Sequence, residues 1–123
     1  MSSERLPYDL HLDVKFAPLE TIDLNEIVAA NKPWFNQTLS KINGSVRRVG
    51  IVEGEFHWHK HEEDDELFFV LSGKLFVDTE RGNFELGPNQ GVTVPKGVLH
   101  RTRAPDKTVV LMVENAGIQL EGN

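Results

Sequence analysis

The chain has no cysteine and no long run of apolar residues. A small secreted domain often depends on disulfide bonds, and this sequence cannot form one. No apolar stretch approaches the roughly 18–20 residues that a membrane-spanning helix needs. Residues 1–10 also lack the apolar region and the cleavage pattern of a signal peptide. These absences predict a cytoplasmic protein with no membrane partner.

Basic residues are also scarce. The sequence holds 13 Lys and Arg against 19 Asp and Glu, which gives a net charge of -6 and an isoelectric point of about 5.3. Nucleic-acid-binding proteins usually carry a basic stripe, and here the only tight basic pair is Arg47–Arg48. Nucleic acid is therefore not an expected partner, and a small-molecule ligand or substrate is.

Internal repeats, low-complexity tracts and linkers are absent as well. A chain of 123 residues with 39% hydrophobic and 26% charged residues is typical of one globular domain. We therefore predict a single domain over residues 1–123. Within it, residues 1–37 form an N-terminal extension with a short helix, and residues 38–116 form a β-barrel.

The N-terminal extension carries two local patterns. Apolar residues alternate over His11–Phe16, which predicts a short edge strand. Asp23 followed by Glu26 resembles a capping box, and the apolar spacing after it predicts a helix over Leu24–Ala30. Two helical turns are too short to be stable alone, so this helix must pack on another element.

From Thr38 onward the chain consists of short apolar segments separated by turn signals, which indicates an all-β sandwich or barrel. Leu67–Leu71 is apolar on both faces, so each face needs a cover. In a barrel one face is the lumen, and the other is covered by the N-terminal segment or by a second subunit; we predict a homodimer. The predicted strands cover residues 46–52, 56–61, 66–71, 74–78, 84–86, 91–95, 99–103 and 108–114.

Three histidines occupy alternate positions in the segment 56–61, at His57, His59 and His61. Alternate residues of a strand point to one face, so two of these imidazoles can converge on one ion. Glu66 begins the next predicted strand, which we expect to pair with the histidine strand through the acidic loop between them. His100 is distant in sequence and follows a Pro-x-Gly turn.

Three imidazoles and one carboxylate suit a divalent transition metal such as Fe, Mn, Ni, Zn or Cu. We therefore predict one such ion as the cofactor, held by His59, His61, Glu66 and His100. Four protein ligands around an octahedral ion leave two positions for water, substrate or dioxygen. An adventitious patch of histidines is the simpler alternative, and the spacing of Glu66 and His100 argues against it.

These residues resemble two sequence motifs of the cupin superfamily. His59-x-His61, four residues, Glu66, six residues, Gly73 matches the first motif, and Pro95-x-Gly97, two residues, His100 matches the core of the second. The resemblance implies an all-β, double-stranded β-helix (a jelly-roll β-barrel) with the metal near one end of its lumen. The sequence departs from the motifs at the leading glycine of the second, where Asn89 stands, and at its closing asparagine, where Ala104 stands.

His57 is the candidate catalytic residue, as an acid or base beside the metal, and a structural role at a strand corner is the alternative. A lumen-facing Arg47, Arg48 or Gln37 is a further candidate. The resemblance allows isomerase-, oxygenase- or decarboxylase-like chemistry, because a fold does not choose a reaction. A non-catalytic barrel that binds metal and a small ligand is the competing interpretation.

Overall fold

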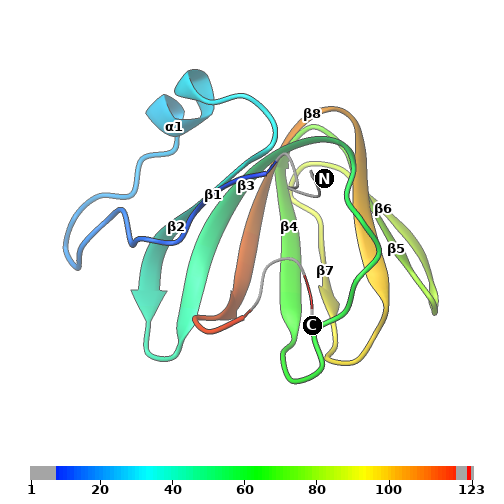
Figure 1. Cartoon of the computed structure of the whole chain (residues 1–123). Coiled ribbons are helices and arrows are strands. Elements are labelled where there is room, and N and C mark those ends of the chain that lie inside the picture. The colour runs from blue at the N-terminus through cyan, green and yellow to red at the C-terminus, as the bar shows by residue number, and fades with distance from the viewer. Residues whose placement is uncertain (1–7, 119–121, 123) are drawn as a thin grey trace, which may run out of the picture.

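The computed structural model describes residues 8–118 and 122. These residues form strands curved around one lumen, with the helix beside one edge (Figure 1). The all-β jelly roll that the sequence predicted is therefore the observed fold. The elements in chain order are β1 (Asp9–His11), α1 (Asn25–Ala30), β2 (Phe35–Ile42), β3 (Ser45–Glu55), β4 (Glu66–Ser72), β5 (Leu75–Thr79), β6 (Gly82–Leu86), β7 (Gly91–Val94) and β8 (His100–Asn115).

The long strand β8 organises the barrel because it pairs with three other strands. Its C-terminal part lies antiparallel between β3 and β4, while its first residues, 100–103, pair with β5. On either side the order continues through β2 and β1 from β3, and through β7 from β4. The two strands predicted over 99–103 and 108–114 are thus one continuous element, bent where the register with β3 shifts between Val52 and Gly54.

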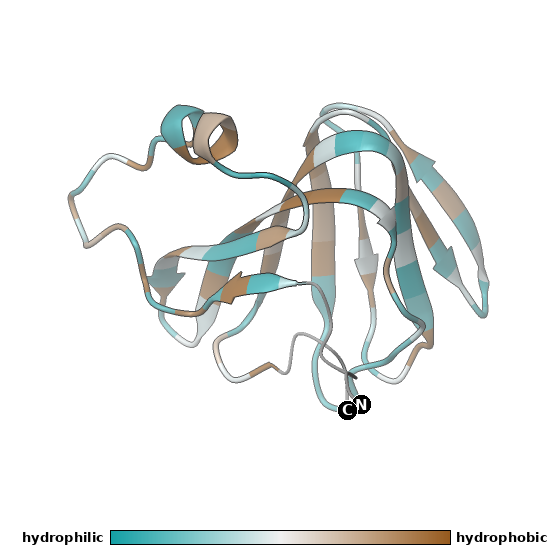
Figure 2. Ribbon diagram, turned by 45° about the horizontal axis from the view of Figure 1, so that its top comes forward, coloured by the Kyte–Doolittle hydropathy of each residue, from teal (hydrophilic) through white to brown (hydrophobic). Residues whose placement is uncertain are grey.

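Alternation along β3 and β8 creates two separate apolar clusters. The lumen cluster contains Phe68, Val77 and Met112 among others. The second cluster lies on the outer face of β2, β3 and β8, where Ile27 of the helix packs near Val49. Figure 2 shows this as brown and teal residues alternating along the strands. The short helix thus packs on the sheet, as the sequence required.

Two predictions for the N-terminal extension need correction. The expected strand over 11–16 is wrong, because β1 covers Asp9–His11 and pairs parallel to β2 before the chain leaves the sheet. The expected capping box is also absent. Leu24 occupies the N-cap with no side-chain cap, and the Asp23 carboxylate accepts from the Asn25 backbone N–H at 2.9 Å. An Asx-type turn therefore precedes the helix.

The outer face of β4 is only partly covered. Leu67 and Phe69 are half-buried, and Leu71 is exposed. The helix covers β2, β3 and β8 instead of this strand. The homodimer that would bury this face stays a prediction. Among the described residues, no helix is long and apolar enough to cross a membrane.

Candidate metal centre

His59 and His100 are held opposite each other by the backbone. The His59 N–H donates to the His100 carbonyl at 2.9 Å, and the His100 N–H donates to the His59 carbonyl at 2.8 Å. This isolated bridge is the only strand-like pairing of segment 56–61. The predicted strand over 56–61 is therefore wrong, and so is its predicted pairing with β4. The segment bridges to the start of β8, while β4 lies between β7 and β8.

The turn around Pro95 and Gly97 positions His61. The Gly97 N–H donates to the His61 carbonyl at 2.8 Å, and Gly97 has a positive φ of 81° that favours glycine. The neighbouring Lys96 N–H donates to the Asp65 carboxylate at 2.9 Å, one residue before Glu66. These two bonds fasten the acidic loop to the turn, so the two sequence motifs meet in space.

The four predicted ligands come together in the barrel. Their ligand atoms all lie within 4.8 Å of one another, and His61 Nε2 and His100 Nε2 lie 3.2 and 3.6 Å from Glu66 Oε1. All four side chains are buried, with exposures between 1% for His100 and 9% for His59. The sequence pattern therefore predicted this cluster, which can hold a metal ion, although the local strand was wrong.

The hydrogen bonds of the imidazoles leave the inward nitrogens available. His59 Nδ1 lies 2.9 Å from the His57 carbonyl, and His100 Nδ1 lies 2.9 Å from the Val98 carbonyl. A carbonyl only accepts, so each Nδ1 carries the proton and each Nε2 keeps a lone pair. His61 Nε2, His100 Nε2 and Glu66 Oε1 are buried without a hydrogen-bond partner among the described residues. Unpartnered buried atoms of these types fit a divalent transition metal.

The electrostatics of the cluster favour neutral imidazole and charged carboxylate. Burial lowers the pKa of His59 to about 4, and the nearby His100 and His61 act in the same direction. Burial works against the charge of Glu66, yet the adjacent imidazoles of His100 and His61 lower its pKa to about 2. Metal ligands must be deprotonated, so His59 and Glu66 are in the binding form near neutral pH.

A buried hydrogen-bonded pair, Arg48 and Glu114, lies behind Glu66, and sequence reasoning missed half of it. Arg48 Nε donates to Glu114 Oε2 at 3.0 Å, and the two side chains are 3% and 0% exposed. Arg48 also donates to Thr38 Oγ1. Burial and the adjacent charge of Glu66 raise the pKa of Glu114 to about 9, although Arg48 opposes this. Residues of β8 alternate between its two faces, so Glu114 shares a face with the buried Met112. This alternation is the sequence signal that could have predicted the burial of Glu114.

A pocket opens beside the cluster, with about 570 Å³ of empty space that is partly continuous with solvent. His59 and Glu66 belong to both the cluster and the pocket wall. Phe56 and Trp34 line it as well. The rest of the wall consists of Tyr8, Leu10, Phe35, Asn36, Val52, Phe68, Thr102 and Met112.

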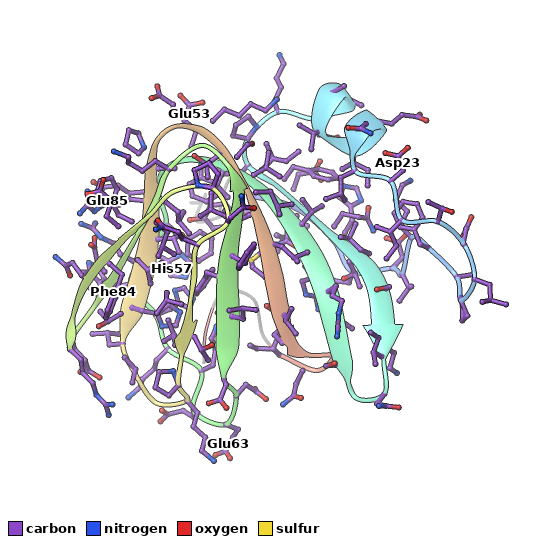
Figure 3. The ribbon with its side chains drawn as sticks, turned by 180° about the vertical axis from the view of Figure 1, so that it is seen from behind. Asp23, Glu53, His57, Glu63, Phe84 and Glu85 are labelled. Carbon is purple, nitrogen blue, oxygen red and sulfur yellow. The ribbon has the colours of Figure 1, made fainter. Side chains whose placement is uncertain are left out.

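His57 lies beside the cluster and outside it. Its ring centroid is 5.1 Å from that of His59 and 4.4 Å from that of Phe56, and Tyr8 Oη is 3.4 Å from His57 Nδ1 (Figure 3 labels His57). The other candidate residues, Arg47, Arg48 and Gln37, form hydrogen bonds with groups outside the four-residue cluster. Arg48 is buried and Arg47 is half-buried, and Arg47 donates to Ser45 Oγ. Gln37 donates to the Asp13 and Thr38 carbonyls.

Comparison with known proteins agrees with the fold and the motifs. The family model described as "Cupin domain" matches residues 48–114, which is more than half of the chain. The uncharacterized protein YdbB of Bacillus subtilis (strain 168) is 40% identical over 81 residues, which cover 65% of this chain and 72% of that protein.

Two solved structures are similar over most of their length. A cupin-2 domain containing protein from Shewanella frigidimarina NCIMB 400 has a TM-score of 0.69 at 28% identity, covering 74% of this chain and 89% of that one. Protein NMB1881 from Neisseria meningitidis has a TM-score of 0.69 at 26% identity, covering 78% and 99%. With the family match over 48–114, these similarities show that the chain belongs to the cupin domain family.

Proposed function

We propose that this protein holds one divalent transition metal on His59, His61, Glu66 and His100 and binds a small organic molecule at that metal. The observation that carries the proposal is the set of buried, unpartnered ligand atoms that lie within 4.8 Å of one another. Because His59 and Glu66 also line the pocket, an ion held by them borders a space that a small molecule can enter.

A bound metal of this kind polarises a carbonyl or enolate, or activates dioxygen. The chain itself supplies the fixed tautomers of His59 and His100 and the charged carboxylate of Glu66. The aromatic wall of the pocket excludes water from the reacting end of a ligand. Isomerase-, oxygenase- and decarboxylase-like reactions all fit this arrangement, and the proposal does not choose among them.

His57 is the proposed proton-transfer residue of such a reaction. It belongs to the segment that carries His59 and His61, and its ring lies next to that of His59. The alternative is a barrel that binds metal and ligand without turnover. The two differ in one property: a catalyst loses turnover in His57→Ala, whereas a binding protein keeps its ligand affinity and shows no turnover in either form.

Metal content of the purified protein tests the site. Stripped with a chelator and reloaded with Co²⁺ or Zn²⁺, the wild type should hold about one ion per chain. His61→Ala and His100→Ala should each lose most of it, because each removes one of four ligands. His11→Ala is the matched control, since His11 lies on β1 and pairs with Asp9. Elemental analysis that finds wild-type levels in both ligand variants contradicts the proposal.

A further inference from the structure

The wall of the pocket is almost entirely carbon outside the metal ligands. Four aromatic side chains from separate parts of the chain contribute to it: Tyr8, Trp34, Phe56 and Phe68. Tyr8 and Phe56 are stacked with centroids 4.5 Å apart, and Trp34 lies 5.3 and 5.6 Å from them. Broad, rigid rings of this kind accept a planar apolar partner with little loss of side-chain entropy.

Positive side chains are missing from the described wall residues. Arg101 and Arg103, the basic residues of the neighbouring strand, are both bonded to the Asp78 carboxylate, at 3.1 and 2.6 Å. A phosphate group needs Arg, Lys or a helix N-terminus for recognition. Most hydroxyls of a sugar would lose water without gaining a partner, because the wall is mainly apolar. The pocket therefore disfavours sugar phosphates.

One polar group of the wall lacks a partner. Asn36 lines the pocket from β2, and its Oδ1 is buried with no hydrogen-bond donor among the described residues. Buried acceptors are nearly always satisfied in folded proteins, so an orphan one in a pocket wall indicates a donor on the ligand. An amide oxygen accepts from a hydroxyl or an N–H group.

Resting on the proposed function, we infer that the ligand of this pocket is a planar, carbon-rich molecule without phosphate. It binds the metal through one or two oxygen atoms, packs its ring against Phe56 and Trp34, and donates a hydrogen bond to Asn36.

Hydroxamates provide the test, because they chelate metals and differ in their tails. Calorimetric titration of the Zn²⁺-loaded protein should show benzohydroxamate binding about tenfold or more tightly than acetohydroxamate, since only the former carries a ring. Phe56→Ala should remove this preference by weakening the binding of benzohydroxamate. Phe84→Ala is the matched control, because Phe84 is an exposed aromatic residue on β6 (labelled in Figure 3) and should keep the preference.

A second comparison tests Asn36. Among benzohydroxamates with a hydroxyl at the 2, 3 or 4 position, at least one should bind several-fold more tightly than the unsubstituted compound. This gain should vanish in Asn36→Leu, which keeps the branched shape of the side chain and removes the acceptor. Equal gains in both proteins, or no gain from any hydroxyl, would overturn the assignment of Asn36.

The possible failures are distinguishable. If the protein binds Zn²⁺ and neither hydroxamate, the proposed open metal positions are absent and the proposed function fails. If both hydroxamates bind equally, the metal site stands and the ligand class is wrong. Tighter binding of glucose 6-phosphate than of benzohydroxamate overturns the ligand class in the same way. Zinc retention, measured after each titration by equilibrium dialysis, ensures that the chelator has not stripped the site.

Discussion

Glu66 borders two buried regions of opposite character. Toward the pocket its neighbours are aromatic and aliphatic, such as Phe68 and Met112. Deeper in the barrel it adjoins Glu114, which is paired with Arg48. One strand, β8, supplies both Met112 and Glu114, two residues apart on its inner face. The apolar region is suited to receive a ligand, and the region of Arg48 and Glu114 is suited to fix the carboxylate of the candidate metal cluster.

The region of Arg48 and Glu114 has a cost that the apolar region lacks. Taking Arg48 and Glu114 out of water is expensive, and such a pair is rarely a net gain in stability. Removing one partner is worse, because it leaves the buried polar atoms of the other without a hydrogen-bond partner. We therefore expect substitutions of Arg48 or Glu114 to change folding stability much more than substitutions in the apolar pocket wall.

The largest expected effect is on folding stability in Glu114→Leu. Arg48 then stays charged in the barrel without its partner, because a guanidinium cannot lose its proton. We expect a loss of about 3–5 kcal/mol in the free energy of unfolding, measured by urea denaturation of the metal-free protein. The double variant Arg48→Met/Glu114→Leu should recover most of this loss.

Glu85→Leu is the matched control for that substitution. Glu85 pairs with Lys74 at 2.9 Å, and both side chains are more than half exposed. Such surface pairs contribute roughly 0–1 kcal/mol, so the variant should stay near wild-type stability. Similar losses for Glu85→Leu and Glu114→Leu would mean that the buried pair has no special role.

The next effect is a pH dependence of the metal-free protein. His59 has a folded-state pKa of about 4, lowered by burial from the ordinary 6.5. Between these values the unfolded chain takes up a proton that the folded chain does not, so stability falls as the pH drops from 6.5 toward 4. The full contribution is about 3 kcal/mol.

His59→Gln isolates this contribution. The raised pKa of Glu114, about 9, acts in the opposite direction, because the folded state keeps a proton there that the unfolded state releases above about 4.5. Both proteins share that effect, so their difference reports on His59. Urea denaturation at pH 6.5 and 5.0 with a chelator should show a smaller acid loss in the variant. Equal acid losses would show that His59 titrates normally and that the cluster is wetter than its burial indicates.

The sequence predicted the ligands better than the elements that carry them. His59, His61, Glu66 and His100 follow from motif spacing, which a chain must keep when four side chains meet at one point. The segment 56–61 alternates like a strand and still has only one bridge, to β8, because a few hydrogen bonds with β8 and one from Gly97 position it without a continuous ladder. Local periodicity does not contain such distant contacts.

The burial of Glu114 and the composition of the pocket wall were harder to predict from the sequence, because they too depend on contacts between distant residues. An acidic residue near the end of a β-branched strand usually faces water, and only the three-dimensional position of Arg48 explains its burial. Asn89 is the opposite case. Where the second motif expects glycine, Asn89 adopts a positive φ of 67°, as a short polar side chain permits.

The smallest expected effect concerns His57, whose ring lies next to the rings of Phe56 and of the cluster residue His59. The contact that orients His59 comes from the His57 backbone carbonyl, which alanine retains. His57→Ala should therefore keep about one metal ion per chain, whereas loss of a group that orients a ligand costs roughly 10–100-fold in affinity. Elemental analysis and a competitive zinc titration measure this directly. If His57→Ala instead lost the metal, His57 would be a metal ligand, and the proposed set of four ligands would lack one member.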